Sequence, residues 1–423
     1  MRRALPVLSL PCLLAAQAPQ AQTAPVPKPD PALAHARRLL ASTLLVDGHN
    51  DLPWTIREDP KAPRDVEAYD LRRPTSGPTD LARLKQGMVG AQFWSVYVPG
   101  ETKEGFAKVQ LEQLDLARRM IARYPEALEL ALGTADIRRI RAKGKVASLL
   151  GMEGGHVLEN SLGALRAYYD LGARYLTLTH NVTLDWADAA LDAPKHHGLT
   201  PFGKEVVREM NRLGMLVDLS HVSPDVMRDV LDTSAAPVIF SHSSARALVD
   251  HPRNVPDAIL ARMAANGGVV MVTFIPSFVN KDVKAWSEGL EQEAKAKGIA
   301  FDADYKTLEA AYAKAHGPSP KAALKDVANH IDHVAKVAGH DHVGISSDFW
   351  GGDMPVGLED VSKYPDLLAE LVRRGWQDDD LRKLAGGNLM RAFARAEAVS
   401  GRLRKERPAS TATLERLDRA PKP

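Results

Sequence analysis

Residues 216–244 read LVDLSHVSPDVMRDVLDTSAAPVIFSHSS and contain one complete unit of the predicted fold. Two short apolar runs, Leu216–Leu219 and Pro237–Phe240, flank a piece of helical period. Each run is followed by the dipeptide Ser-His, at 220–221 and 241–242. A strand, a helix and a second strand are the unit from which parallel sheets are built. The stretch therefore predicts an α/β fold with polar residues directly after its strands.

Similar runs, rich in Val, Ile, Leu, Phe and Thr, recur along the chain between longer stretches of helical period. The eight runs are Thr43–Val46, Val89–Val98, Val146–Gly151, Tyr175–Thr179, Leu216–Leu219, Pro237–Phe240, Val269–Ile275 and Val343–Ser346. Eight alternating strands and helices fit a closed (β/α)8 TIM barrel better than an open sheet. A doubly wound sheet is the alternative, but the sequence has no G-x-G-x-x-G after the first run and no G-x-x-x-x-G-K-[ST].

The composition indicates a soluble globular protein, with 423 residues of which 45% are hydrophobic and 26% charged. Lys and Arg number 55 against 53 Asp and Glu, a net charge of +2, so no basic excess points to nucleic acid or to an anionic membrane. This length suits one large domain or two ordinary ones. Because no internal segment is biased enough to be a linker, we expect one barrel domain over residues 33–398.

The first residues are typical of a secretory signal peptide. A positively charged start precedes an apolar run over 4–16 and an A-x-A-like exit at 16–18. The run is too short to span a membrane. We expect residues 1–18 to be removed and the mature protein to be exported, either periplasmic or secreted. A Pro/Ala-rich flexible tether at 19–32 and a fraying C-terminal tail at 399–423 would flank the barrel.

Cys12 is the only cysteine in the sequence and lies inside the predicted signal peptide. Its removal would leave a mature protein with no disulfide and no thiol nucleophile. The alternative is a lipoprotein anchor at Cys12, but Pro11 stands where a small residue is wanted and the apolar run before it is short.

Six of the eight runs are followed by a histidine or a carboxylate. In a parallel barrel all the carboxyl ends of the strands lie on one rim, which is the catalytic face. We therefore expect these side chains to converge although they are spread over about 300 positions. The six endings are VDGHND at 46–51, GMEGGH at 151–156, LTH at 178–180, SH at 220–221, SH at 241–242 and SD at 347–348.

Five of these residues have the chemistry of metal ligands. His49 and Asp51 are two positions apart, which puts both on one face of a strand. Glu153 offers two oxygens from a neighbouring strand end, and His221 and His242 follow consecutive strands. Three imidazoles and two carboxylates suit two Zn²⁺-like ions, with Glu153 as the bridge. A single metal would leave two of the five residues without a role.

Each of these residues also has a structural interpretation. A histidine after an apolar strand is more often hydrogen-bonded within the barrel than bound to a metal. Asp51 could be the N-cap of a helix before Pro53, and Asp348 could cap a turn before Gly351. A purely structural set is disfavoured because burying so many ionisable groups together costs on the order of several kcal/mol without a metal or substrate.

A long connection follows the seventh run, over roughly Pro276–Pro320, and carries two charged, Ala-rich segments of helical period. An excursion of this kind after a barrel strand typically builds a wall or a lid over the site. A surface insertion without a role in the site is the alternative.

Motifs spread over roughly residues 40–395 resemble, in the same order, those of the membrane dipeptidase (renal dipeptidase) family, a metallopeptidase branch of the amidohydrolase superfamily. The motifs are VDGHNDLPW at 46–54, GMEGGH at 151–156, LTLTH at 176–180, DLSHVS at 218–223, FSHSS at 240–244, RNVPD at 253–257, GISSDF at 344–349 and GLEDVSKYPD at 357–366. The resemblance implies a (β/α)8 barrel and a zinc site with two Zn²⁺ ions per chain. It assigns His49 and Asp51 to one ion and His221 and His242 to the other, with Glu153 as a bridging and catalytic residue.

The resemblance also implies roles for three further residues. His180 matches the histidine that polarises the scissile carbonyl, Arg253 the arginine that binds the substrate carboxylate, and Asp348 the acidic residue that handles protons and the substrate amine. Elementary chemistry agrees, because hydroxide shared by two Zn²⁺ ions needs no side-chain nucleophile. The planar fork of an arginine suits a terminal carboxylate, which would limit substrates to short peptides.

Two departures from the family pattern concern the expected pocket walls. The family commonly has Asp-Phe-Asp-Gly where this chain has Asp348-Phe349-Trp350-Gly351, and the loop over 181–188 differs from that of the mammalian enzymes. Neither change involves a proposed metal ligand, so they bear on substrate preference. The segment 181–183 is a formal glycosylation sequon, which we discount because it lies beside His180.

The leading hypothesis is an exported zinc dipeptidase that hydrolyses the peptide bond of dipeptides with a metal-bridged hydroxide. The alternative is a related binuclear-metal amidohydrolase acting on lactones, β-lactams or acyl-amides, since barrel and ions do not fix the substrate. A metal-free exported binding protein is disfavoured because every proposed ligand is present. We expect small dipeptides as partners, no nucleic acid, no transmembrane span and, from the family alone, a possible homodimer.

Overall fold

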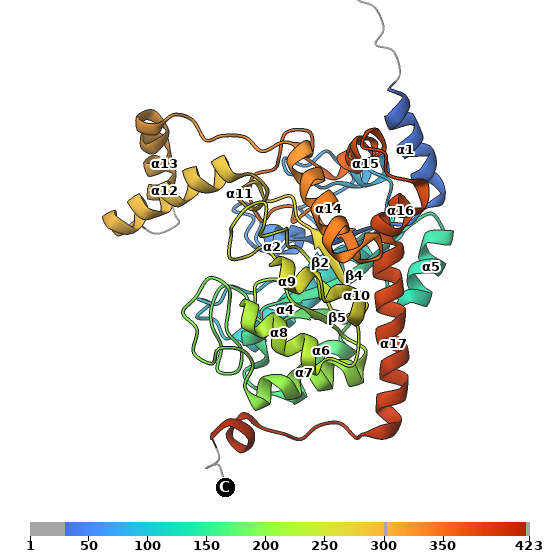
Figure 1. Cartoon of the computed structure of the whole chain (residues 1–423), viewed down its shortest axis with the longest axis vertical. Helices are drawn as coiled ribbons and strands as arrows, with labels where there is room; N and C mark the ends of the chain where they lie inside the picture. Colours follow the sequence, from blue (N-terminus) through green and yellow to red (C-terminus); the bar gives the residue numbers. More distant parts are fainter. Residues whose placement is uncertain (1–29, 300–302, 420–423) are drawn as a thin grey trace, which may run out of the picture.

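A computed structural model describes residues 30–299 and 303–419 and contains a nearly closed barrel of eight parallel strands (Figure 1). The strands are β1 (Leu45–Asn50), β2 (Val89–Ser95), β4 (Val146–Glu153), β5 (Ala173–Thr177), β6 (Leu216–Asp218), β7 (Ile239–Phe240), β8 (Val269–Val272) and β9 (Val343–Ile345), and they pair in this order. A parallel bridge between Asn50 and Phe349 joins the last strand to the first. The predicted (β/α)8 barrel is confirmed.

The bounds of the observed strands differ most from those of the predicted apolar runs where polar residues lie within a strand. The run predicted to end at Val46 continues as β1 to Asn50, because Asp47 and His49 extend the strand while remaining buried. One strand was not predicted: β3 (Leu128–Leu130) pairs with β4 outside the barrel order. It is short and only partly buried, so it lacks the apolar run that marks the barrel strands.

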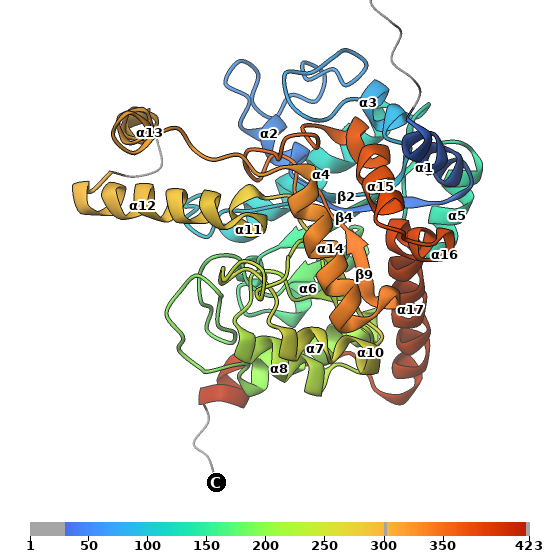
Figure 2. The ribbon, with the colours of Figure 1, turned by 45° about the horizontal axis from the view of Figure 1, so that its top comes forward.

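Helices separate the barrel strands and cover the outside of the barrel (Figures 1 and 2). No helix in the described part of the chain combines the length and the apolar character needed to cross a membrane. The helices between β1 and β8 are α2 (Leu52–Arg57), α3 (Leu81–Gln86), α4 (Phe106–Arg123), α5 (Thr134–Ala142), α6 (Leu162–Asp170), α7 (Pro201–Leu213), α8 (Pro224–Thr233), α9 (Asp257–Leu260) and α10 (Met263–Asn266). Those outside this range, apart from the insertion described below, are α1 (Pro31–Ser42), α14 (Leu324–Ala338), α15 (Tyr364–Arg373), α16 (Asp378–Arg382) and α17 (Asn388–Glu406).

The last long helix closes the amino end of the barrel. Leu389 and Phe393 of α17 are buried in one apolar cluster with inward residues from the beginnings of the strands, among them Val46, Ala147 and Val269. This packing fills the barrel interior at the end where the strands begin. The polar residues that follow the strand ends are therefore left at the opposite, open end, where the catalytic face of such a barrel lies.

The helix α1 begins at Pro31, within the range 19–32 that we expected to be a tether. Asp30 caps it, since its Oδ1 accepts a hydrogen bond of 3.0 Å from the N–H of Ala32, and a proline is favoured in the first helical turn. The predicted signal peptide, Cys12 and the rest of the predicted tether lie outside the described residues.

The expectation that the chain frays after residue 398 is wrong for residues 399–419. Helix α17 continues to Glu406, and Ser400 donates a hydrogen bond of 2.7 Å to the carbonyl of Arg212. Further on, Leu414 is buried, and Asp418 accepts a hydrogen bond of 2.6 Å from the Thr200 hydroxyl at the start of α7. The Arg- and Pro-rich composition that suggested fraying concealed these few anchoring contacts.

The predicted helical insertion after the seventh strand is confirmed. It consists of α11 (Pro276–Val279), α12 (Lys281–Lys297) and α13 (Ala303–His316). Figures 1 and 2 both show α12 and α13, which we call the arm, extending away from the body of the barrel. Only α11 stays at the barrel, where the carbonyl of Phe278 accepts a hydrogen bond of 2.8 Å from Asn254. The wall expected over the site is thus limited to α11.

Candidate active site

The structure brings the five predicted metal ligands together at the open end of the barrel. His49 Nε2 lies 3.2 Å from Asp51 Oδ1 and 3.4 Å from Glu153 Oε2. On the other side of Glu153, Oε1 lies 2.9 Å from His221 Nε2 and 3.4 Å from His242 Nε2. Each oxygen of Glu153 therefore faces a different pair of residues, which is the geometry of a bridging carboxylate.

The donor atoms fit two cations. The ligand atoms of His49, Asp51 and Glu153 lie within 4.8 Å of one another, and so do those of Glu153, His221 and His242. The Nε2 atoms of His221 and His242 are only 3.0 Å apart, close enough for both to bind the same cation. Imidazole nitrogen and carboxylate oxygen are ligands typical of zinc.

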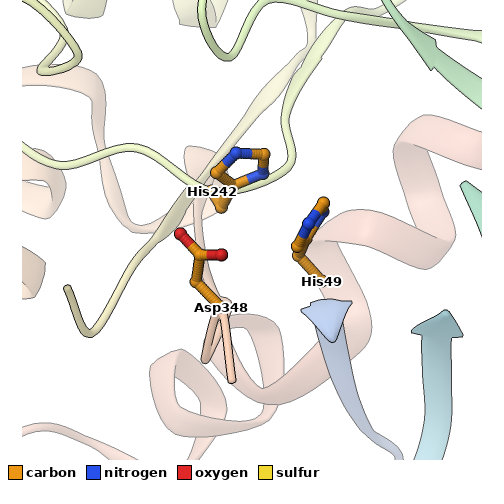
Figure 3. Close-up of side chains that lie close together, drawn as sticks. All are labelled: His49, His242 and Asp348. Atoms are coloured by element: carbon orange, nitrogen blue, oxygen red, sulfur yellow. The ribbon is translucent and has the colours of Figure 1, made fainter. Parts of the chain in front are cut away.

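Asp348 lies beside this cluster and forms a third donor group with His49 and His242, whose side chains point toward one another (Figure 3). It follows β9 with a left-handed backbone, φ 58°, held by a hydrogen bond of 3.2 Å from its N–H to the His49 carbonyl. Burial raises the pKa of Asp348 to about 7, with the carboxylates of Asp51 and Glu153 adding to the rise against the opposing charge of His49. Its carboxyl group is therefore suited to exchanging a proton near neutral pH.

The Nδ1 atom of each ligand histidine has a hydrogen-bond partner that directs Nε2 toward Glu153. The three pairs are His49 with the Tyr175 hydroxyl at 2.8 Å, His221 with Asn181 Oδ1 at 3.0 Å, and His242 with Ser241 Oγ at 2.8 Å. Such outer partners fix the tautomer and the ring orientation of metal-binding histidines. None of the three partners was predicted from the sequence; only the repeated Ser-His dipeptide, at 220–221 and 241–242, carried a signal for one of them.

The charges of the cluster match this arrangement in the protein without metal. Burial lowers the pKa of His221 and of His242 well below the usual value, so both rings are neutral and can donate a lone pair. Burial alone would raise the pKa of Glu153, but the charge of His49 opposes burial and the pKa lies well below its usual range. Glu153 is therefore an anion between nitrogen donors.

His180 and Arg253 border the cluster on the side of His221 and His242. The His180 ring lies 4.4 Å from the His221 ring and 4.8 Å from that of Tyr97, and burial lowers its pKa, which keeps it neutral. Arg253 is buried, with Nη2 3.3 Å from the His242 carbonyl and the guanidinium 5.2 Å from the centre of the Phe278 ring.

The Arg253 guanidinium lacks an ion-pair partner in the part of the chain that the structure describes, and its buried Nε has no hydrogen bond there. Burial lowers the pKa of Arg253 only to about 10, so it remains a cation. Burying a cation without a carboxylate partner costs on the order of several kcal/mol of desolvation free energy. A bound anionic ligand would offset this cost. All eight predicted site residues thus lie in one place.

Trp350, the residue that departs from the family pattern, is anchored against the loop between α2 and α3. A side chain at Gly77 would collide with its ring, since a Cβ atom there would lie 1.7 Å from Cη2. The indole is half-buried and has a left-handed backbone, φ 78°. The aromatic residue thus ties the segment after β9 to this loop.

The chain is similar to known proteins of one peptidase family. The model of the membrane dipeptidase family, peptidase family M19, matches residues 33–407. Dipeptidase 3 of Rattus norvegicus is 42% identical over 379 residues, which is 88% of this chain and 69% of that protein. The range matched by the family model includes all eight predicted site residues.

Solved structures similar to this chain include those of two bacterial proteins. The probable dipeptidase PvdM from Pseudomonas aeruginosa superposes with a TM-score of 0.76 at 27% identity, over 87% of this chain and 99% of that chain. A metallo peptidase from Rhodobacter sphaeroides, liganded with a phosphinate mimic of the dipeptide L-Ala-D-Ala, superposes with a TM-score of 0.68 at 26% identity, over 84% and 100% of the two chains.

Proposed function

Because the chain belongs to the membrane dipeptidase family, peptidase family M19, we propose that it is an exported, zinc-dependent dipeptidase with two Zn²⁺ ions per chain. The observation that carries the zinc proposal is the position of Glu153, with Oε2 facing His49 and Asp51 and Oε1 facing His221 and His242. Three nitrogens and two carboxylates arranged in this way divide naturally into two ligand sets that share one residue.

Two Zn²⁺ ions held there would supply hydroxide near neutral pH, because the metals lower the pKa of water. The chain's own part is to keep the donor atoms in place and to exclude competing protons. His221 and His242 are neutral and buried and Glu153 is ionised, so these three residues can bind a cation without losing a proton. His49, whose pKa is raised by Tyr175, Asp51 and Glu153 against the effect of burial, would release a proton when the metal binds. The absence of a thiol nucleophile from the site is consistent with this chemistry.

The remaining site residues would orient a dipeptide. Arg253 would hold the terminal carboxylate through its two-pronged guanidinium. His180, neutral and half-buried, would donate an N–H to the oxygen of the scissile carbonyl, where negative charge develops. Asp348, with a pKa raised to about 7, would bind the substrate amine and transfer a proton to the leaving nitrogen.

The position of Arg253 explains why two-residue peptides would be preferred. Its Nη2 lies 3.3 Å from the carbonyl of His242, which is itself a proposed metal ligand. A carboxylate bound to Arg253 would therefore lie close to the zinc site, which favours a scissile bond near the carboxyl end of the substrate. The dipeptide mimic bound by the Rhodobacter sphaeroides relative supports the same substrate class.

Export is supported by the sequence of residues 1–18, which has the charge, apolar run and small-residue exit of a signal peptide. Amino-terminal sequencing of the protein recovered from the exported fraction of expressing cells tests this part. A mature terminus shortly after residue 18 is expected, and an intact terminus on protein retained inside the cell would contradict export.

The activity is tested with the zinc-loaded protein and three matched compounds: a free dipeptide of the Ala-Ala type, its N-acetyl derivative and a lactone. We expect turnover of the free dipeptide and little of the other two, since Asp348 and Arg253 would need the free amine and carboxylate. Equal turnover of the acetylated compound would contradict a dipeptidase. Turnover of the lactone alone would identify a related amidohydrolase instead.

A further inference from the structure

We propose that Ser241 and Asp218 are positioning residues that fix the tautomer and orientation of His242 for zinc binding; the inference rests on the zinc site of the proposed function. Asp218 is the last residue of β6, and Ser241 and His242 directly follow β7. All three side chains are buried, with exposed fractions of 0%, 0% and 1%. They form a continuous hydrogen-bonded chain from the barrel wall to the metal ligands.

The direction of each hydrogen bond follows from the donors available. The Ser241 Oγ lies 2.5 Å from Asp218 Oδ2 and 2.8 Å from His242 Nδ1. A hydroxyl has one hydrogen, and the carboxylate, which can only accept, takes it. Toward His242 the same oxygen must accept, so the proton of the imidazole is on Nδ1. The lone pair is then on Nε2, which faces Glu153 Oε1 at 3.4 Å.

The Asp218 carboxylate is itself held in one orientation by backbone and side-chain donors. Oδ1 accepts from the N–H groups of Ser220 and Ser241, at 3.1 and 2.8 Å, and Oδ2 accepts from Thr177 Oγ1 at 2.5 Å. No Lys, Arg or His forms an ion pair with Asp218 among the residues described. Burying a carboxylate without a cation partner costs free energy. The Asp218 carboxylate accepts a hydrogen bond from the Ser241 hydroxyl, which in turn contacts the His242 imidazole.

Asp47 is a second buried carboxylate in the barrel, and its contacts show the pattern expected of a purely structural role. Asp47 accepts hydrogen bonds from Ser347 Oγ at 2.6 Å, the Ser347 N–H at 2.7 Å and the Tyr364 hydroxyl at 2.7 Å. These contacts join β1 to the segment after β9 and help to close the barrel. Asp47 has no hydroxyl link to the Nδ1 atom of a ligand histidine, whereas Asp218 has one.

The other two ligand histidines have neutral partners at Nδ1, Tyr175 for His49 and Asn181 for His221. Within residues 30–299 and 303–419, His242 is the ligand histidine whose partner leads on to a carboxylate. Such a link makes the imidazole a more basic ligand as well as orienting it. We therefore expect the ion bound by His221 and His242 to depend on Ser241 more than the ion bound by His49 and Asp51.

Two substitutions separate the positioning role from a structural one. Ser241→Ala and Thr177→Val each remove one hydroxyl that donates to the same oxygen, Asp218 Oδ2, at the same distance of 2.5 Å. Only Ser241 also contacts an imidazole. Zinc affinity is measured by competition with a chromophoric chelator, and thermal unfolding of the metal-free proteins measures the structural cost of each change.

We expect Ser241→Ala to weaken the binding of one zinc ion about 10–100-fold, the usual cost of losing an outer partner of a metal ligand. Thr177→Val should bind both ions as the wild type does, although both variants lose thermal stability. Asp218→Asn, which keeps the shape of the side chain, should weaken the same ion and serves as the second variant if Ser241→Ala does not fold.

Equal zinc affinity in Ser241→Ala and the wild type would overturn the inference while leaving the proposed function intact. Equal losses in Ser241→Ala and Thr177→Val would also overturn it, because the effect would then be one of packing. A wild-type protein that binds no zinc would overturn the proposed function and this inference with it.

Discussion

The open end of the barrel, which we call the mouth, and the arm formed by α12 and α13 differ in where their charged side chains lie. At the mouth, ionisable side chains such as Glu153, His221 and His242 are buried and joined to one another within 2.9 to 3.4 Å. In the arm, charged residues lie at the surface in single helical ion pairs, and Leu290, Ala294 and Leu308 form a small apolar cluster of their own.

The difference shows that the free-energy cost of burying ionisable groups is concentrated at the mouth. Surface ion pairs contribute about 0–1 kcal/mol each and tolerate change. Buried ionisable groups persist only where partners or a ligand compensate for their desolvation. Substitutions at the mouth should therefore alter the chemistry, and substitutions in the arm should leave dipeptide turnover unchanged.

The largest effect is expected for His221→Ala at the mouth. It removes a proposed metal ligand, and since losing even an outer partner typically costs 10–100-fold, dipeptide turnover should fall by more than about a hundredfold. The circular dichroism spectrum should remain that of a folded protein. Initial rates and zinc content per chain are the measurements. Retained activity would show that the ligand set is wrong.

A smaller loss is expected for Arg253→Lys, which keeps the positive charge but removes the two-pronged donor. Hydrogen bonds to charged groups contribute about 1.5–3 kcal/mol, so kcat/KM for a free dipeptide should fall about 10–100-fold, mainly through KM. A dipeptide amide, which lacks the terminal carboxylate, should be hydrolysed equally poorly by both proteins. If the substitution slows the amide as much as the free dipeptide, Arg253 does not bind the carboxylate.

A third prediction concerns His330 on α14, where the chain returns from the arm to the barrel. Its Nδ1 accepts a hydrogen bond of 3.0 Å from the N–H of Ala245, and burial lowers its pKa to about 4. Between this value and the ordinary pKa of about 6.5, the unfolded chain binds a proton that the folded protein does not. Stability is therefore fully present above pH 6.5 and is lost as the pH falls toward 4, by up to about 3 kcal/mol.

Urea unfolding at a series of pH values compares the wild type with His330→Asn, whose side-chain oxygen can replace Nδ1 as acceptor. The variant should lose less stability on acidification while its dipeptide turnover at pH 7 stays that of the wild type. An identical slope of stability against pH in the two proteins would rule out this source of acid sensitivity.

The smallest effect on turnover is expected in the arm. Leu290→Ala should destabilise the packing of the arm by about 2–5 kcal/mol, measurable as faster proteolysis within α12 and α13, while kcat and KM stay unchanged. The matched change Leu219→Ala removes a buried leucine two positions before His221 and should lower turnover. A fall in turnover of Leu290→Ala as large as that of Leu219→Ala would place the arm in the site.

The sequence was sufficient to predict the barrel because each strand is an apolar run of the right length between helical stretches. It was also sufficient to bring seven of the eight site residues together, since residues after parallel strands share one rim whatever their separation. Arg253 was predicted from the family resemblance alone. These predictions depend on the order of elements and on residue type. The conformations of individual side chains are not needed for either the barrel or the residues at its rim.

The parts that the sequence did not predict depend on individual contacts. Tyr175 lies within a strand and looks like any apolar core residue, so its hydroxyl bond to His49 left no pattern. The docking of residues 399–419 depends on single anchors such as Leu414 and Asp418 in a segment of fraying composition.

The central claim is that Glu153 separates two cation sites at the mouth of the barrel, and zinc anomalous scattering from crystals of the zinc-loaded protein tests it most directly. Two peaks are predicted, one among His49, Asp51 and Glu153 and the other among Glu153, His221 and His242. A single peak, or peaks away from Glu153, would contradict the claim.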